Sequence, residues 1–339
     1  MEAGLSFSAA DLAQTRFAVS PMWEVVTSFR LLRGTEGEPP PHRRWSSQVR
    51  PRLREAGLDR GWLATLIPAG RYLADFLNPT PAAPFPTLAA ELDAIRRTPA
   101  DRVRTELDML CAERDVGRSP RVRLLREAPE AALRKVTAEI EAYWELALAP
   151  YWGRVRQLLE ADVFHRARQV AEHGAGQVLS ELHETVRWDD GTLRLVRRHC
   201  GLSRAEAGAG LLLVPSAFAW PRVLTRSVAP DPPQLAYPAR GIGTLWERRN
   251  TGAVDAVAAV LGRSRTLLLA ELDTPASTTQ LAASFGMSAA GVSQHLTALR
   301  GAGLVSAHRA GRSVLYARTA VADALLTPAE AEGHPSARR

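Results

Sequence analysis

The sequence predicts a mainly α-helical protein with small β elements, in which a larger mixed, mostly helical N-terminal domain precedes a smaller C-terminal domain. Three observations predict this fold class. Apolar residues recur at helical spacing through most of the first 180 residues, and short runs of strand character between turn residues follow over 185–240. Near the carboxyl end, two short helical patterns are followed by a hairpin pattern. All eight tryptophans lie at or before Trp246, so the two parts have differently built interiors.

The N-terminal domain is expected over 1–245, helical to about 184 and β-rich over 185–240. Its helical patterns cover 9–32 (interrupted at Pro21), 100–115, 129–149 and 151–183. Its strand signals cover a hairpin at 185–196 and two runs at 211–218 and 222–227, whereas the proline-rich stretch 229–238 is expected to be irregular. A second domain is expected over 246–326 with a leading helix at 253–261, and a disordered tail over 327–339.

Composition restricts the classes of protein to which the chain can belong. Hydrophobic residues make up 46% of it, which argues against extensive disorder, and no apolar run approaches the roughly 18 residues of a membrane helix. The first residues lack the basic and apolar regions of a secretory signal. Cys111 and Cys200 lie outside any Cys-x-x-Cys pattern, as suits reduced thiols. We therefore expect a cytoplasmic protein without a membrane partner.

The net charge of +7 favours a polyanionic partner, but its distribution is more informative than its size. Lys135 is the only lysine, so the arginine content partly reflects high-GC codon usage. Between 262 and 319 there are six arginines against Glu271 and Asp273, a net charge of +4. More than half of the excess charge therefore falls within the second domain.

Two helices joined by a tight turn are predicted over 277–301. Ser277 and Gln280 have the spacing of a capping box, and Gly286 stands where the first helix must stop. Ser288 is the expected N-cap of the second helix. A hairpin pattern over 305–318 follows, and helix, turn, helix and hairpin together are the layout of a winged helix-turn-helix, which places its second helix in the major groove of DNA.

The second helix has two faces. Val292, Leu296 and Leu299 recur at i, i+4 and i+7 and form its expected buried stripe. The opposite face is small or hydrogen-bonding, which allows close approach to base edges. An ordinary amphipathic helix would share the periodicity, but the turn and the hairpin favour DNA binding. The expected contacts of this helix are Ser288, Ala289, Ala290, Ser293, Gln294, Thr297 and Arg300.

The hairpin tip supplies two further expected DNA contacts. Arg309 and Arg312 flank Ala310-Gly311 and are placed to reach phosphates or an adjacent minor groove. A solvated hairpin with two solubilising arginines is the alternative reading of either residue taken singly.

The same residues resemble the ArsR/SmtB group of bacterial transcriptional regulators. The resemblance rests on the segments 261–272, 277–283, 292–296, 299–304 and 311–316. It implies a homodimer on a palindromic operator, usually a repressor released by an effector, with Val254, Val257, Leu261 and the helix 321–326 helping to join the protomers. The segments 220–224 and 237–241 are also similar to a long N-terminal domain of undefined function that precedes such winged helices in regulators from high-GC bacteria.

The usual metal sites of that group are not matched. No cysteine occurs over 277–284, and 321–326 offers only Asp323. Thiolate or multi-imidazole coordination cannot be assembled from these residues. We expect no metal and no other cofactor.

The N-terminal domain carries weaker signals. Trp144, Tyr151 and Trp152 could line a cavity for an apolar effector, although core packing explains them better. No phosphate-binding loop and no Gly-x-Ser-x-Gly elbow occurs, and Gly241-Ile-Gly243 lacks the third glycine of a dinucleotide site. We therefore expect no enzyme.

These observations predict a sequence-specific, homodimeric DNA-binding transcriptional regulator that is expected to act as a repressor on double-stranded operator DNA. Its N-terminal domain is expected to bind a small-molecule effector or to shape the dimer. The alternative is an N-terminal small-molecule-binding or enzymatic domain for which the winged helix is a dimerisation or contact module.

Overall fold

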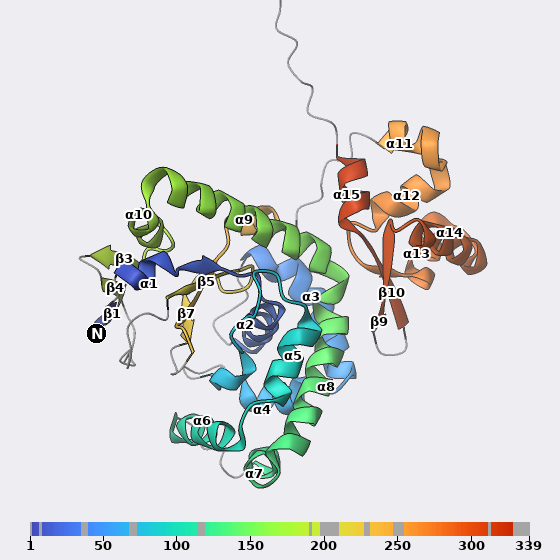
Figure 1. Ribbon diagram of the computed structural model, residues 1–339. Coiled ribbons are helices and arrows are strands. Elements are labelled where there is room, and N and C mark those ends of the chain that lie inside the picture. The colour runs from blue at the N-terminus through green and yellow to red at the C-terminus, as the bar shows by residue number, and fades with distance from the viewer. Residues whose placement is uncertain are drawn as a thin grey trace, which may run out of the picture. The chain divides into compact units, whose positions relative to one another are not determined.

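A computed structural model describes residues 2–6, 9–34, 40–67, 73–113, 119–189, 192–196, 210–226, 231–246, 254–310 and 313–327. The chain divides into two compact units, described separately below (Figure 1). The first comprises Met1–Leu148 and Val155–Trp246, and the second comprises Ala149–Arg154 and Glu247–Arg339. The expected tail lies outside the described residues apart from Thr327.

Helices dominate the described residues, and the fold class expected from the sequence is confirmed. The α-helices that precede Trp246 are α1 (Ala9–Ala13), α2 (Pro21–Arg33), α3 (Arg43–Glu55), α4 (Trp62–Leu66), α5 (Leu88–Arg96), α6 (Ala100–Glu113), α7 (Pro120–Glu127), α8 (Pro129–Ala147), α9 (Trp152–His173) and α10 (Ala175–Ser180). Short 3-10 turns, including η1 (Pro40–His42), η3 (Asp75–Leu77) and η4 (Ala149–Tyr151), connect some of them.

A four-stranded sheet lies at the centre of the first unit. Its order is β2 (Arg16–Phe17), β5 (Leu212–Ser216), β7 (Gln234–Pro238), β6 (Leu224–Arg226). The first three strands are parallel, and β6 runs antiparallel to β7. A separate antiparallel sheet contains β1 (Glu2–Ser6), β4 (Thr192–Val196) and β3 (Val186–Asp189).

Both faces of the central sheet are covered, which explains the continuous apolar run of β5. On one face, Leu211 and Leu213 pack with residues of α10, β3 and β4. On the other face, Leu212 and Val214 pack with Trp23 of α2. Alternate side chains of β5 therefore pack into two different hydrophobic cores, one on each face of the sheet.

Helix α2 begins where the sequence pattern 9–32 is interrupted. Pro21 occupies its first turn, and the Ser20 hydroxyl accepts a hydrogen bond from the Trp23 N–H. The buried carboxylate of Glu91 accepts hydrogen bonds from the Ser20 hydroxyl (2.6 Å) and the Met22 N–H (2.8 Å). Pro21 thus starts a helix and does not kink one.

Two other expectations for this unit are wrong in detail. The stretch 229–238, expected to be irregular, contains β7, which is paired on both sides because Pro238 falls at its last position and leaves the other N–H groups free to bond. The long helix expected over 151–183 divides into α9 and α10 because Gly174 adopts a φ of 83°.

The second unit has its own hydrophobic core. Its helices are α11 (Val254–Leu261), α12 (Arg263–Glu271), α13 (Thr278–Phe285), α14 (Ala289–Gly301) and α15 (Ala320–Leu326). Its sheet has the order β8 (Ala276–Ser277), β10 (Ser313–Arg318), β9 (Val305–Ala310). Leucines of α12, α13 and α14 fill the core with Leu304 and Val305, and Ala322 and Leu326 of α15 are buried against them.

Candidate nucleic-acid interface

The turn between α13 and α14 is built as the sequence predicts. The Gln280 N–H donates to the Ser277 hydroxyl at 3.3 Å, and the Ser277 N–H donates to the Gln280 side chain at 2.8 Å, which completes the capping box. Gly286 ends α13 with a φ of 61°, in the left-handed region where a side chain would be strained. The Ser288 hydroxyl then accepts a hydrogen bond from the Gly291 N–H at 3.1 Å and caps α14.

One side of α14 is buried in the core of the second unit. Val292 and Leu296 are fully buried and Leu299 is 2% exposed, so the stripe read from their spacing is confirmed. This stripe fixes the rotation of the helix about its axis, and therefore determines which residues face outward.

The opposite side of α14 is exposed in the second unit. Ser288, Ala289, Ala290, Ser293, Gln294, Thr297 and Arg300 are all exposed. The Thr297 hydroxyl donates to the Ser293 carbonyl at 2.9 Å, so its hydrogen is already engaged within the helix. Ser293 and Gln294 therefore have the hydrogen-bonding side chains best suited to base edges, on a surface that carries no large apolar residue.

The wing is a three-stranded sheet instead of a simple hairpin. β9 and β10 pair antiparallel, as the sequence predicts, with Val305 opposite Arg318 at one end and Ala310 opposite Ser313 at the other. The sequence reading missed β8, whose two residues pair with Leu315 and Tyr316 and so tie the wing to the start of α13. Arg309 is exposed near the tip of the wing, whereas Arg312 lies outside the described residues.

Arg318, one of the six arginines counted over 262–319, is buried and does not lie on the basic surface. Arg318 is only 8% exposed and lies in the interior of the second unit. Its guanidinium group pairs with Asp273 at 2.6 Å and with Asp323 at 3.0 Å. Arg318 therefore joins the wing to α15 and to the end of α12, and it is not part of an exposed basic surface. Sequence spacing gave no signal of this network, because its members lie 45 and 5 residues apart.

Asp323 is thus engaged at the position where a metal ligand was sought on the last helix. Among the described residues, no group of three or more histidine, cysteine, aspartate or glutamate side chains is arranged to hold a metal ion. None of the helices described is both long and apolar enough to cross a membrane.

The three aromatic residues named for an effector do not belong to one compact unit. Trp144 is buried near the end of α8 in the first unit. Tyr151 and Trp152 fall within Ala149–Arg154, which belongs to the second unit, and Tyr151 is buried there while Trp152 is half-buried. Burial of Trp144 and Tyr151 is what core packing requires.

Comparison with protein families gives two separate matches. Residues 266–307 match the family described as bacterial regulatory protein, arsR family, and this match runs from within α12 to the first residues of β9. Residues 100–243 match a family of unknown function, DUF5937. Both parts of the expected resemblance are confirmed: an ArsR-type helix-turn-helix follows an upstream domain of undefined function.

No curated protein and no solved structure matches the chain. The arsR-family match nevertheless supports a DNA-binding transcriptional regulator, because its residues are those that form the helix-turn-helix and support its exposed face.

Proposed function

We propose that this protein is a homodimeric, sequence-specific repressor that binds operator DNA through α14 and the wing. The observation that carries the proposal is the outward face of α14, which is small, polar and held in position by the buried Val292, Leu296 and Leu299. A helix of this kind can enter the major groove, about 12 Å wide, without steric conflict from its own side chains.

The roles of the exposed residues differ by their chemistry. Gln294 can donate and accept together, as in the bidentate pairing of an amide with adenine, and Ser293 can bond to any base. Ala289 and Ala290 allow close approach, and the Ser288 cap points the first amides of α14 toward a phosphate or a base edge. Thr297, Arg300, Arg309 and Arg312 would hold the DNA backbone.

Helices α11 and α15 of the second unit offer a surface for a second copy. α11 and α15 contact each other, and Val260 is 84% exposed on α11, while Val321 and Leu325 are 59% and 44% exposed on α15. Val254, Val257 and Leu261, also named for the protomer contact, are partly buried against the module's own core. Apolar side chains on two neighbouring helices suit an isologous contact, and two-fold symmetry would then place two half-sites about one helical turn of DNA apart.

Repression and its release are part of the proposal by analogy with the arsR family. We propose an effector other than a metal ion, sensed through the N-terminal unit. Of the three aromatic residues named for an apolar effector, Trp144 is the one that belongs to this unit, and it remains the proposed contact there.

Capture of genomic fragments by the purified protein, followed by sequencing, tests the proposal. We expect a palindromic motif to be enriched by the natural protein and by Gln177→Ala, a glutamine substitution on the exposed surface of α10 in the other unit. Gln294→Ala should enrich a broader set of sequences. Recovery of random fragments by all three proteins would contradict sequence-specific binding.

A further inference from the structure

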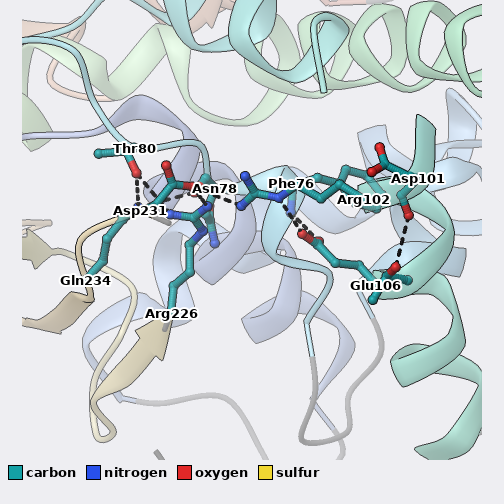
Figure 2. Close-up of polar contacts among 10 residues, drawn as sticks. Phe76, Asn78, Thr80, Asp101, Arg102, Glu106, Arg226, Asp231 and Gln234 are labelled. Carbon is teal, nitrogen blue, oxygen red and sulfur yellow. Dashed lines mark hydrogen bonds and ion pairs between the residues drawn. The ribbon is translucent and has the colours of Figure 1, made fainter. Parts of the chain in front are cut away.

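Two arginines from different elements of the first unit converge on one carboxylate oxygen (Figure 2). Arg102 lies on α6 and Arg226 is the last residue of β6. Their Nη2 atoms lie 3.0 Å and 2.5 Å from Oδ2 of Asp231, which precedes β7. Burial alone would raise the pKa of Asp231, but the hydrogen bonds and charges of Arg226 and Arg102 hold this pKa below its ordinary value. The group is therefore an anion.

Arg226 forms the floor of this cluster. Its side chain is 2% exposed, and its Nη1 donates to the Thr80 hydroxyl at 3.0 Å. A guanidinium group buried to this degree needs an anion beside it. Asp231 supplies that anion, and the carboxylate of Glu106 pairs with Arg102 but also accepts the Phe76 N–H.

Two buried polar atoms of the cluster have no hydrogen-bond partner among the described residues. They are Nε of Arg226 and Oδ1 of Asn78, a residue that is 1% exposed. Buried polar atoms are almost always satisfied in a purely structural network. Of the two, Nε of Arg226 is a donor and offers a carboxylate a hydrogen bond that no described residue uses, whereas Oδ1 of Asn78 is an acceptor and does not.

Asp231 and Arg102 are the partly exposed members of this arrangement. The Asp231 side chain is 28% exposed, whereas Arg226 and Asn78 are buried beneath it. Exchange of Asp231 for another carboxylate would preserve the ion pairs of both arginines, and Asp231 itself would be hydrated at little cost. The planar fork of a guanidinium group matches a carboxylate, and the chain already places one there.

We propose that Arg102 and Arg226 form a binding site for the carboxylate of a small organic acid, for which Asp231 is an internal competitor. Nε of Arg226, which has no hydrogen-bond partner among the described residues, supplies a further donor to the ligand's carboxylate. The site belongs wholly to the first unit, so it goes beyond the DNA-binding function and does not depend on it.

Calorimetric titration of the full-length protein with sodium acetate and sodium succinate tests the site, with sodium phosphate and sodium chloride at equal ionic strength as the other arms. Because Asp231→Asn keeps the size of the side chain and removes the competing charge, this variant should bind acetate at least tenfold more tightly than the natural protein. Adding Arg102→Gln to it should remove that gain. Arg60→Gln, whose side chain is 83% exposed, is the matched control and should change nothing.

Asp231→Asn also removes the anion beside a buried guanidinium group, so it can lower stability. If the variant is too unstable to titrate, acetate must raise its melting temperature more than chloride does. Equal acetate affinity in the natural protein and Asp231→Asn would overturn the proposal. So would the absence of saturable binding in both, or phosphate and chloride binding as tightly as acetate. No operator DNA is used, so failure here leaves the proposed repressor function intact.

Discussion

Glu24 illustrates how burial sets the protonation state of a single side chain. It lies on α2 beside the carboxyl end of β5, where its carboxyl oxygens accept the Ala217 N–H at 3.1 and 3.3 Å. Burial raises the pKa of Glu24 from 4.5 to about 8, and hydrogen bonds from Ser216 and Ala217 only partly oppose this shift. The group is therefore largely protonated near neutral pH.

This shift makes stability depend on pH. In the unfolded chain Glu24 releases its proton near pH 4.5, whereas in the folded chain it keeps the proton to about pH 8. Its contribution to the free energy of unfolding is thus fully present below pH 4.5. This contribution is lost as the pH rises to about 8, by up to about 1.4 kcal/mol per pH unit. Glu24→Gln should flatten this slope in urea unfolding at pH 6.5 to 8. The exposed Glu130→Gln is the control and should retain it.

The buried imidazole of His42 has the opposite dependence. Burial lowers its pKa from 6.5 to about 4, with the backbone of Ala217 opposing. As the pH falls below 6.5, the unfolded chain binds a proton at His42, whereas the folded chain does not bind it until about pH 4. The free energy of unfolding therefore decreases as the pH falls from 6.5 to about 4. The Trp246 Nε1–H donates to His42 Nδ1 at 3.1 Å, which requires the neutral ring. Measurements for Glu24 should therefore stay above pH 6.5 where the two effects are to be separated.

Substitutions of Gln294 and of Arg309 should weaken DNA binding in different ways. Gln294→Ala should lose about 1–3 kcal/mol of binding to the operator and little to random duplex, because its amide reads a base. Arg309→Ala should weaken binding to every sequence and reduce the slope of log affinity against log salt by about one. Fluorescence anisotropy on both duplexes at several salt concentrations measures each quantity. Equal losses on both duplexes for the two variants would refute the assignment of the faces.

At the scale of elements, the exposed apolar residues of α11 and α15 carry the dimer prediction. Val260→Asp places a charge on a side chain that is 84% exposed in the single chain, so it should leave the fold intact and disrupt only a contact with a second copy. Sedimentation velocity should show a shift from dimer to monomer. Phe164→Asp on α9, where the phenylalanine is 75% exposed, is the matched control and should sediment as the natural protein does.

The elements that the sequence predicts well are those whose signals are local. The capping box at Ser277, the glycine stop at Gly286 and the stripe on α14 involve residues at most seven positions apart, so propensity and periodicity determine them. The DNA-facing surface follows from that stripe. It could therefore be specified residue by residue, although contact with DNA remains a prediction.

Elements whose existence depends on distant partners could not be predicted in the same way. β7 is a strand because β5 and β6 pair with it, whereas Pro238 and the prolines before the strand gave the opposite local signal. β2 has two residues and exists only through its pairing with Leu212 and Leu213. The arginine cluster on Asp231 joins positions 129 and 5 residues apart, and no spacing rule reveals such a site.

At the scale of the whole molecule, the count of 43 lysine and arginine residues overstates the basic surface available to DNA. Arg318 is neutralised by Asp273 and Asp323 within the second unit. In the first unit Arg226 and Arg102 are balanced by Asp231 and Glu106, so they add nothing to a basic surface. Arg300 and Arg309 of the second unit are exposed, so single substitutions there are expected to change DNA affinity measurably.

Division into two units with separate cores makes the effects of core substitutions local. Leu296 contacts a cluster composed wholly of residues from 254 to 326, and Val136 of α8 is buried in the first unit. Leu296→Ala should destabilise the winged-helix unit by about 2–5 kcal/mol, because it leaves a cavity among packed leucines. Hydrogen exchange followed by mass spectrometry should then show faster exchange in α12 to α14 and unchanged exchange in α2. Val136→Ala should give the reciprocal pattern. If either substitution accelerates exchange equally in both units, the chain unfolds as one cooperative body, and an effector bound to the first unit could act through global stability alone.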